Sequence, residues 1–244
     1  QFFKTNLHKF QEEIDSFALF PSLFMALSNK ERTLEHYDGT LCFMDSEGNI
    51  LKDGVAPRDY KEYIGEAVEE YSYLKSPYYK PMGYPQGMYR VGALARLNIA
   101  SNCGTPLADE ELKNFKALGG GKPVLNSFYY HYARLIEILY TIEKIEELLN
   151  DKETISDSVK TTSKISLTKG VGCSEAPRGT LFHDYEVTKE GIITKVNLII
   201  ATGNNNLAMN AGVKQVAQAF IDANSITDGA LNRVEAVIRC FDQK

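Results

Sequence analysis

The segment from Gly170 to His183 holds the residues whose types and spacing are best suited to chemistry. It reads Gly-Val-Gly-Cys-Ser-Glu-Ala-Pro-Arg-Gly-Thr-Leu-Phe-His, so glycine-bounded turns bracket Arg178, and Pro177 restricts the backbone just before it. A guanidinium held in this way offers a planar fork of donors and a permanent charge, which suits an anionic ligand or a proton-transfer partner. The same arginine could instead pair with a nearby carboxylate and brace the loop, and physical chemistry alone favours this second role.

Cysteine and histidine, common ligands of transition metals, are scattered along the chain. No Cys-x-x-Cys pair occurs among the four cysteines, which are Cys42, Cys103, Cys173 and Cys240. The histidines are too dispersed to predict a zinc site or a catalytic triad, and they are His8, His36, His131 and His183. Isolated thiols fit a reducing cytoplasm better than a secreted disulfide scaffold, so each is expected to be a small core or surface residue.

The composition is that of a globular chain. With 244 residues, of which 43% are hydrophobic, it can bury a core as one large domain or two small ones. A net charge of −5, spread along the sequence, argues against a nucleic-acid groove and an anionic membrane surface. No stretch approaches the roughly 20 apolar residues of a membrane span. The start, at Gln1, has no signal-peptide pattern. The chain also does not begin with Met, which fits a processed or excised product, and an artificially chosen start would look the same.

The elements that must position Arg178 are expected to form an α+β fold, mainly α, with long core helices and a small β-hairpin region. Apolar residues three and four apart predict one helix over 3–17, ending near Pro21. A hairpin is expected where 40–44 and 49–51 flank a Ser-Glu-Gly turn. A short helix is then predicted over 57–68.

A tyrosine-rich loop and two further helices are predicted next. Successive Pro and Gly turn signals over 71–89 indicate a long ordered loop. A helix over 107–118 should stop at the triple glycine 119–121. These glycines could also cradle a phosphate, but no strand precedes them and no Lys-Ser/Thr pair follows, so this is the weaker alternative. The apolar stripe over 125–149 predicts a long core helix.

A polar, Ser/Thr-rich connection over 150–163 is the candidate internal boundary. It separates a helical part with the hairpin and the Tyr/Pro-rich loop (1–150) from a strand-hairpin part with two C-terminal helices (151–244), within what is expected to be one continuous domain. The β-branched segments that predict strands are 164–167, 181–187 and 192–201. The closing helices are expected near 207–223 and 231–241.

Several stretches resemble the large, catalytic subunit of nickel–iron hydrogenases. The run Glu-Ala-Pro-Arg-Gly-x-Leu-x-His at 175–183 is similar to the fourth characteristic motif of that family. The other similar stretches are Tyr-Arg-Val-Gly at 89–92, Ala-Arg-Leu-Asn at 95–98, and the segments 126–134, 199–206 and 231–239. The resemblance covers nearly the whole chain and is greatest to the soluble cytoplasmic branch, which includes the methyl-viologen-reducing and NAD-reducing enzymes.

This resemblance implies reversible oxidation of H2 at a dinuclear nickel–iron centre, with carbon monoxide and cyanide on the iron, at the interface with a small iron–sulfur subunit. It also implies that Arg178 stands beside the metals as a catalytic residue. Together with the backbone near Pro177, Arg178 would donate hydrogen bonds to a cyanide, and the hydroxyl of Thr202 would lie similarly towards a cyanide. Cyanide is a hard anionic acceptor that needs buried donors.

The departures from the family concern the metal ligands. The family holds its metal with two Cys-x-x-Cys pairs, and neither is present here. Asp242 matches the family's aspartate before the second pair, but Gln243 and Lys244 stand at the next Pro and Cys positions. The chain is therefore predicted to be a portion of a large subunit that keeps residues around the centre, binds no metal itself and is inactive alone.

Two alternatives to this hypothesis remain. A hydrogenase-like scaffold that docks a redox partner without catalysis would also lack the ligands. An unrelated binding module would rest only on the glycine run 119–121. For an excised portion of a large subunit, apolar faces left uncovered predict self-association.

Overall fold

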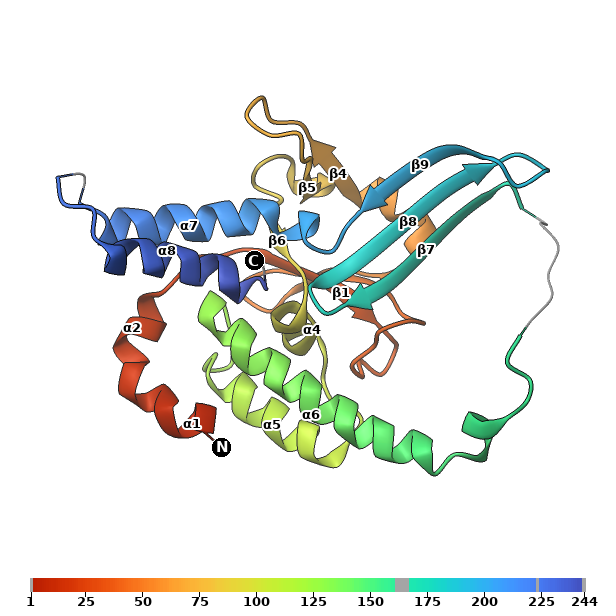
Figure 1. Cartoon of the computed structure of the whole chain (residues 1–244), viewed down its shortest axis with the longest axis horizontal. Helices are drawn as coiled ribbons and strands as arrows, with labels where there is room; N and C mark the ends of the chain where they lie inside the picture. Colours follow the sequence, from red (N-terminus) through yellow and green to blue (C-terminus); the bar gives the residue numbers. More distant parts are fainter. Residues whose placement is uncertain (1, 161–166, 223, 243–244) are drawn as a thin grey trace.

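The computed structural model describes residues 2–160, 167–222 and 224–242, and at its centre is a four-stranded sheet in the order β3-β2-β1-β6 (Figure 1). Its strands are β1 Leu23–Ser28, β2 Thr40–Met44, β3 Ile50–Val55 and β6 Tyr89–Arg90. β2 and β3 confirm the predicted hairpin. The sequence pattern does not predict β1, because all six of its residues are buried and a strand covered on both faces lacks polar alternation.

A second, three-stranded antiparallel sheet has the order β7-β8-β9. Its strands are β7 Lys169–Ala176, β8 Gly179–Val187 and β9 Ile193–Ile199. β8 and β9 confirm the predicted hairpin. Gly170 and Gly172 lie inside β7, so the prediction of two glycine-bounded turns around Arg178 is wrong, and a single turn is present. Of the strand predicted over 164–167, residues 164–166 lie outside the described residues.

A two-stranded ribbon corrects two predictions. The helix expected over 57–68 ends early, as a 3-10 turn Pro57–Asp59 and the one-turn helix α3 Tyr60–Tyr63. The next residues form β4 Ile64–Ala67, which pairs with β5 Ser76–Tyr79 inside the segment expected to be a loop. The partner strand lies some ten residues along the chain and is rich in Pro and Tyr, so local periodicity does not reveal the pairing.

The main helices pack around the central sheet (Figure 1). They are α4 Ala93–Ile99, α5 Pro106–Ala117, α6 Tyr130–Leu149, α7 Asn206–Phe220 and α8 Asp228–Cys240. The last four confirm predicted helices within a few residues. α4 is not predicted by the sequence pattern, because every one of its residues is buried and a helix that is buried all round shows no apolar stripe.

Two predicted helices differ in detail. The helix expected over 3–17 is broken into α1 Phe2–Leu7, a 3-10 turn His8–Phe10 and α2 Gln11–Ser16. In α6, only the first half is core, with Ile136 buried, whereas Ile142 and Ile145 are 58% and 50% exposed. The apolar stripe therefore correctly predicts a helix but wrongly predicts that its whole length is buried.

Two hydrophobic clusters join the two parts of the chain. One contains Leu94 and Leu97 of α4 together with Val237 of α8. The other contains Met25 of β1 together with Phe182 of β8. One continuous domain stays a prediction, which these shared clusters support. Among the described residues, no helix is long and apolar enough to cross a membrane.

Candidate functional site

Pro177 and Arg178 form the two-residue turn between β7 and β8, because Ala176 pairs directly with Gly179. The turn lies against the backbone that follows β6. Gly179 has a φ of +133°, and a Cβ placed on it would lie 2.8 Å from the backbone nitrogen of Gly92. Only glycine combines this conformation with this close approach, so Gly179 determines where the turn lies.

The asparagine run after β9 binds this turn from the other side. The side-chain amide of Asn205 donates to the carbonyl oxygen of Arg178 at 3.3 Å, and its oxygen accepts from the backbone nitrogen of Val91 at 2.9 Å. The neighbouring Asn204 donates to the carbonyl oxygen of Thr180 at 2.7 Å. Both belong to the 3-10 turn Gly203–Asn205, which starts one residue after half-buried Thr202. The fold therefore brings the segment of Thr202 to the Arg178 turn.

The Arg178 side chain points to the end of the described chain. Its Nε donates to the carbonyl oxygen of Asp242 at 2.6 Å and lies 3.3 Å from an oxygen of the Asp242 carboxylate. This is the pairing that the bracing interpretation predicts. The side chain is still 43% exposed, and no acceptor for its Nη atoms occurs among the described residues. Those donors can therefore serve another anion.

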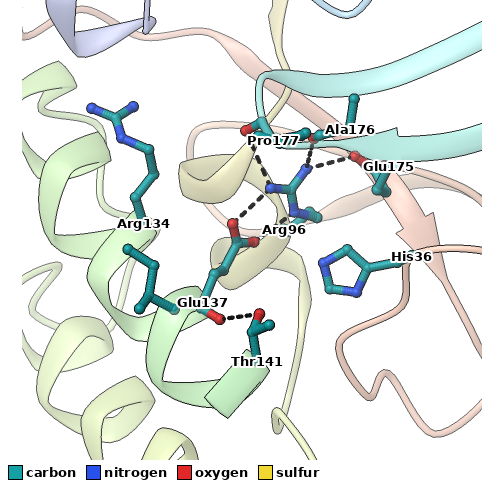
Figure 2. A pocket seen from close by; sticks show the side chains of 9 residues that line it. His36, Arg96, Arg134, Glu137, Thr141, Glu175, Ala176 and Pro177 are labelled. Carbon is teal, nitrogen blue, oxygen red and sulfur yellow. Dashed lines mark hydrogen bonds and ion pairs between the residues drawn. The ribbon is translucent and has the colours of Figure 1, made fainter. Parts of the chain in front are cut away.

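A buried arginine holds the turn from beneath (Figure 2). Arg96 of α4 donates from Nη1 to the Ala176 carbonyl oxygen at 3.0 Å and from Nη2 to that of Pro177 at 3.5 Å. Its Nη1 also bonds the Glu175 carboxylate at 2.8 Å, and Nε and Nη2 bond Glu137 of α6 at 2.6 and 2.7 Å. One guanidinium thus connects two helices to the strand end that carries Arg178.

The charges of this cluster are matched by hydrogen bonds. Burial alone would lower the pKa of Arg96, but the charges and hydrogen bonds of Glu137 and Glu175 outweigh it, so the pKa is raised. The Glu175 side chain is wholly buried and also accepts from the Leu27 backbone nitrogen and the Thr180 hydroxyl, both at 2.8 Å. A buried ion pair with such complete pairing is strongly destabilised when one partner is removed.

A cleft of about 360 Å3 opens beside this cluster, lined by Pro177, Arg96 and His36 among others (Figure 2). Its histidine is stacked on Tyr140, with ring centroids 5.7 Å apart. Burial and the neighbouring Arg96 charge lower the pKa of His36, against the opposing pull of Glu137. The surroundings of His36 therefore favour its neutral imidazole form.

The cysteines are not arranged as metal ligands. Burial raises the thiol pKa of all four, to about 12 for Cys42, Cys103 and Cys240. Cys240 Sγ lies 3.7 Å from Nε2 of His131, whose pKa burial and Arg134 lower to about 4. Over the described ranges, no group of three or more His, Cys, Asp or Glu side chains could hold a metal ion.

Sequence patterns do not predict that Arg96, Glu137 and Glu175 meet, although Arg96 and Glu175 lie in stretches that resemble the family. Arg96 stands in an otherwise apolar run, Val-Gly-Ala-Leu-Ala-Arg-Leu, and this is the available signal. A charge surrounded by apolar neighbours needs a buried partner, but the sequence does not say which carboxylates supply it.

Comparison with known proteins identifies the relatives. A family model described as nickel-dependent hydrogenase matches residues 29–238. The chain is 39% identical over 237 residues to the beta subunit of the NAD-reducing hydrogenase HoxS of Cupriavidus necator, an alignment that covers 96% of this chain and 48% of that protein. It is 41% identical over 216 residues to a subunit of the vhu F420-non-reducing hydrogenase of Methanococcus voltae, covering 88% and 51%.

Solved hydrogenase structures are also similar to this chain. A structure of an NAD+-reducing NiFe hydrogenase in the H2-reduced state superposes with a TM-score of 0.93 at 36% identity, covering 98% of this chain and 53% of that one. A Ni-Fe-Se hydrogenase from D. vulgaris Hildenborough has a TM-score of 0.69 at 18% identity, which shows likeness in fold alone. The chain spans about half the length of the relatives it matches.

Proposed function

The chain belongs to the nickel-dependent hydrogenase family and corresponds to a portion of its large subunit, and from this premise we propose that it lines the nickel–iron centre of the intact enzyme. That centre, with carbon monoxide and cyanide on its iron, would carry out the reversible oxidation of H2 in the intact enzyme. The described residues contain no fitting ligand set, so no metal ligand and no chemical step is assigned to them. The chain's own part is to hold hydrogen-bond donors in place.

One observation carries this proposal. The Pro177–Arg178 turn is held by Arg96 beneath and Asn205 beside it, yet it presents a guanidinium that is 43% exposed. Such a rigid donor, next to the segment of Thr202, suits an anionic group such as a cyanide ligand. We propose Arg178 as the catalytic residue, and Pro177, Arg178 and Thr202 as the residues that contact the cofactor.

The proposal is tested in the full-length enzyme with Arg178→Lys, which keeps the charge but loses the planar fork of donors. We expect metal content to be retained and hydrogen-dependent dye reduction to fall about a hundredfold or more. Arg239→Lys is the matched control, because Arg239 is 67% exposed and, within the part of the chain that the structure describes, its side chain pairs with Glu235 of its own helix alone. A fully active Arg178→Lys enzyme would refute the assignment.

The chain by itself should contain no stoichiometric nickel and should not reduce dyes with H2.

A non-catalytic, hydrogenase-like scaffold is the second candidate function, favoured by the lack of a ligand set among the described residues. It predicts that the full-length protein, too, lacks nickel. Stoichiometric nickel bound to the isolated chain would contradict both.

Partners and location follow the same premise. The relatives are named as subunits, so we propose that the intact protein assembles with other subunits, among them an iron–sulfur small subunit. We also propose a cytoplasmic location, supported by four cysteines that are all free thiols. Self-association of the isolated chain is a further proposal, supported by the exposed apolar stripe on α6.

A further inference from the structure

A second cleft, of about 300 Å3, lies where the β2–β3 hairpin meets the ends of α4 and α5. It shares no lining residue with the cleft beside Pro177. Three of its lining side chains are cationic, namely Arg32, Lys116 and Lys122, and none of its lining residues is acidic. A concave site with this one-sided charge attracts anions.

The three cations that line the cleft come from separate segments of the chain. Arg32 follows β1, Lys116 is in the last turn of α5, and Lys122 follows the triple glycine. A site built from three distant segments is fixed by the tertiary fold. It differs in this respect from a run of charges along one exposed helix.

The existing partners of these cations do not neutralise the cleft. Lys116 donates to the carbonyl oxygen of Ala100, which carries no net charge. Arg32 pairs with Asp53 at 3.2 Å, where the two side chains are 33% and 38% exposed, and Lys122 pairs with Glu47 in a still more exposed position. Ion pairs in such positions are weak, so an anion in the cleft can compete with them.

The charges around Lys116 also favour an anion in the cleft. Burial lowers its pKa, and the nearby positive charge of Arg32 lowers it further, while Cys103 opposes the shift. Two cations that repel each other across a cleft are stabilised together by an anion placed between them.

The cleft also provides uncharged donors and room. Gly121 lines it with a φ of +93°, and a Cβ added there would meet no atom within 4 Å, so a ligand can approach the backbone closely. The exposed Ser101 lines the same cleft and has a hydroxyl that can donate.

We propose that this cleft binds a phosphate group. Three cations lining one cleft suit a tetrahedral oxyanion with several charged oxygens better than a single planar carboxylate. The phosphate can be free or can be the end of a larger organic molecule. This site is separate from the proposed hydrogenase role and does not depend on it.

The test is isothermal titration of the chain with inorganic phosphate at low ionic strength. We expect one saturable site, weakened about tenfold or more by Lys116→Gln, because a hydrogen bond to a charged group is lost. Lys113→Gln is the control, since Lys113 is an exposed residue of the same helix, and it should change the affinity less than about twofold. Adenosine monophosphate in competition with phosphate would indicate an organic phosphate, whereas binding of phosphate alone would indicate a free ion.

A second variant keeps the test interpretable if Lys116→Gln misfolds. Ser101→Asp places a carboxylate among the three cations, so it should abolish phosphate binding without lowering the melting temperature. The proposal is overturned if the unmodified chain shows no saturable phosphate binding. It is equally overturned if both Lys116→Gln and Ser101→Asp bind phosphate as tightly as the unmodified chain.

Discussion

At the scale of single residues, Arg96 is the charge on which the proposed site depends. Its guanidinium is 2% exposed and sits between two carboxylates, of which Glu175 is fully buried. Removing three ionised groups from water costs several kcal/mol each, and only their mutual hydrogen bonds offset that cost. The same guanidinium bonds the carbonyl oxygen of Pro177, so the stability of the core and the position of Arg178 are coupled.

We predict that Arg96→Met destabilises the chain by about 3–5 kcal/mol, because two carboxylates lose their shared cation. Arg96→Lys should lose less, since the charge remains and only the forked geometry is lost. Urea unfolding followed by circular dichroism measures both free energies. The exposed Arg239→Lys should change stability by less than about 0.5 kcal/mol. A stability of Arg96→Met equal to that of Arg239→Lys would refute the role of the cluster.

We predict a pH-dependent stability from His131. Its pKa in the folded chain is about 4, against 6.5 for a free imidazole, because burial and Arg134 disfavour the charged form. The unfolded chain then binds more protons between these values, so stability is lost as pH falls from about 6.5 to about 4, by up to about 3 kcal/mol. His131→Gln should flatten this part of the stability–pH curve in urea titrations. A curve that keeps its slope in the variant would contradict the assignment.

The residue scale also shows what a sequence can and cannot predict. Arg178 stands out because Pro177 and a glycine flank it, which is a local signal. Arg96 binds carboxylates 41 and 79 positions away, so its role depends on contacts that only the tertiary fold creates. For the same reason, the sequence allows a carboxylate partner to be expected for Arg178 but does not predict that this partner is Asp242.

At the scale of elements, α5 and α6 show how tertiary contacts complete local structure. Thr105 precedes α5 but makes no side-chain cap. Instead, the carboxylate of Glu143 on α6 accepts from the Thr105 hydroxyl at 2.6 Å and from the backbone nitrogens of Leu107 and Ala108 at 2.9 and 3.0 Å. The donors at the start of one helix are thus satisfied by its neighbour, which fixes the register between the two.

The predictability of each element follows from its surroundings. Helices with one exposed face, such as α5 and α8, are predicted because their apolar stripes are visible in the sequence. β1 and α4 are buried on all sides and therefore show neither an apolar stripe nor polar alternation, although Arg96 interrupts the apolar run of α4. β4 and β5 depend on pairing with each other, so a local pattern assigns one to a helix and the other to a loop.

At the scale of the whole molecule, the β7–β9 sheet has buried contacts with its neighbours, whereas part of α6 is exposed. The β7–β9 sheet is joined to the body through the Arg178 turn and through the hydrophobic cluster that contains Phe182 and Ile199. The C-terminal half of α6 has no comparable cover among the described residues. Along the whole of α6, exposed apolar side chains recur at steps of three and four, at Leu135, Ile138, Ile142, Ile145 and Leu149. Such a stripe is typical of a helix that packs against another helix.

We predict that the isolated chain self-associates through this stripe, whose five side chains are 44% to 76% exposed along about 21 Å of helix. Sedimentation velocity over a concentration series should show a dimer that grows with concentration. Ile142→Glu should weaken association about tenfold or more, because pairing would then bury an unpaired charge in an apolar contact. Ile226→Glu changes an equally exposed isoleucine, 63% exposed and outside the stripe, and should leave association unchanged. A chain that stays monomeric at high micromolar concentration, or a dimer indifferent to Ile142→Glu, would contradict this prediction.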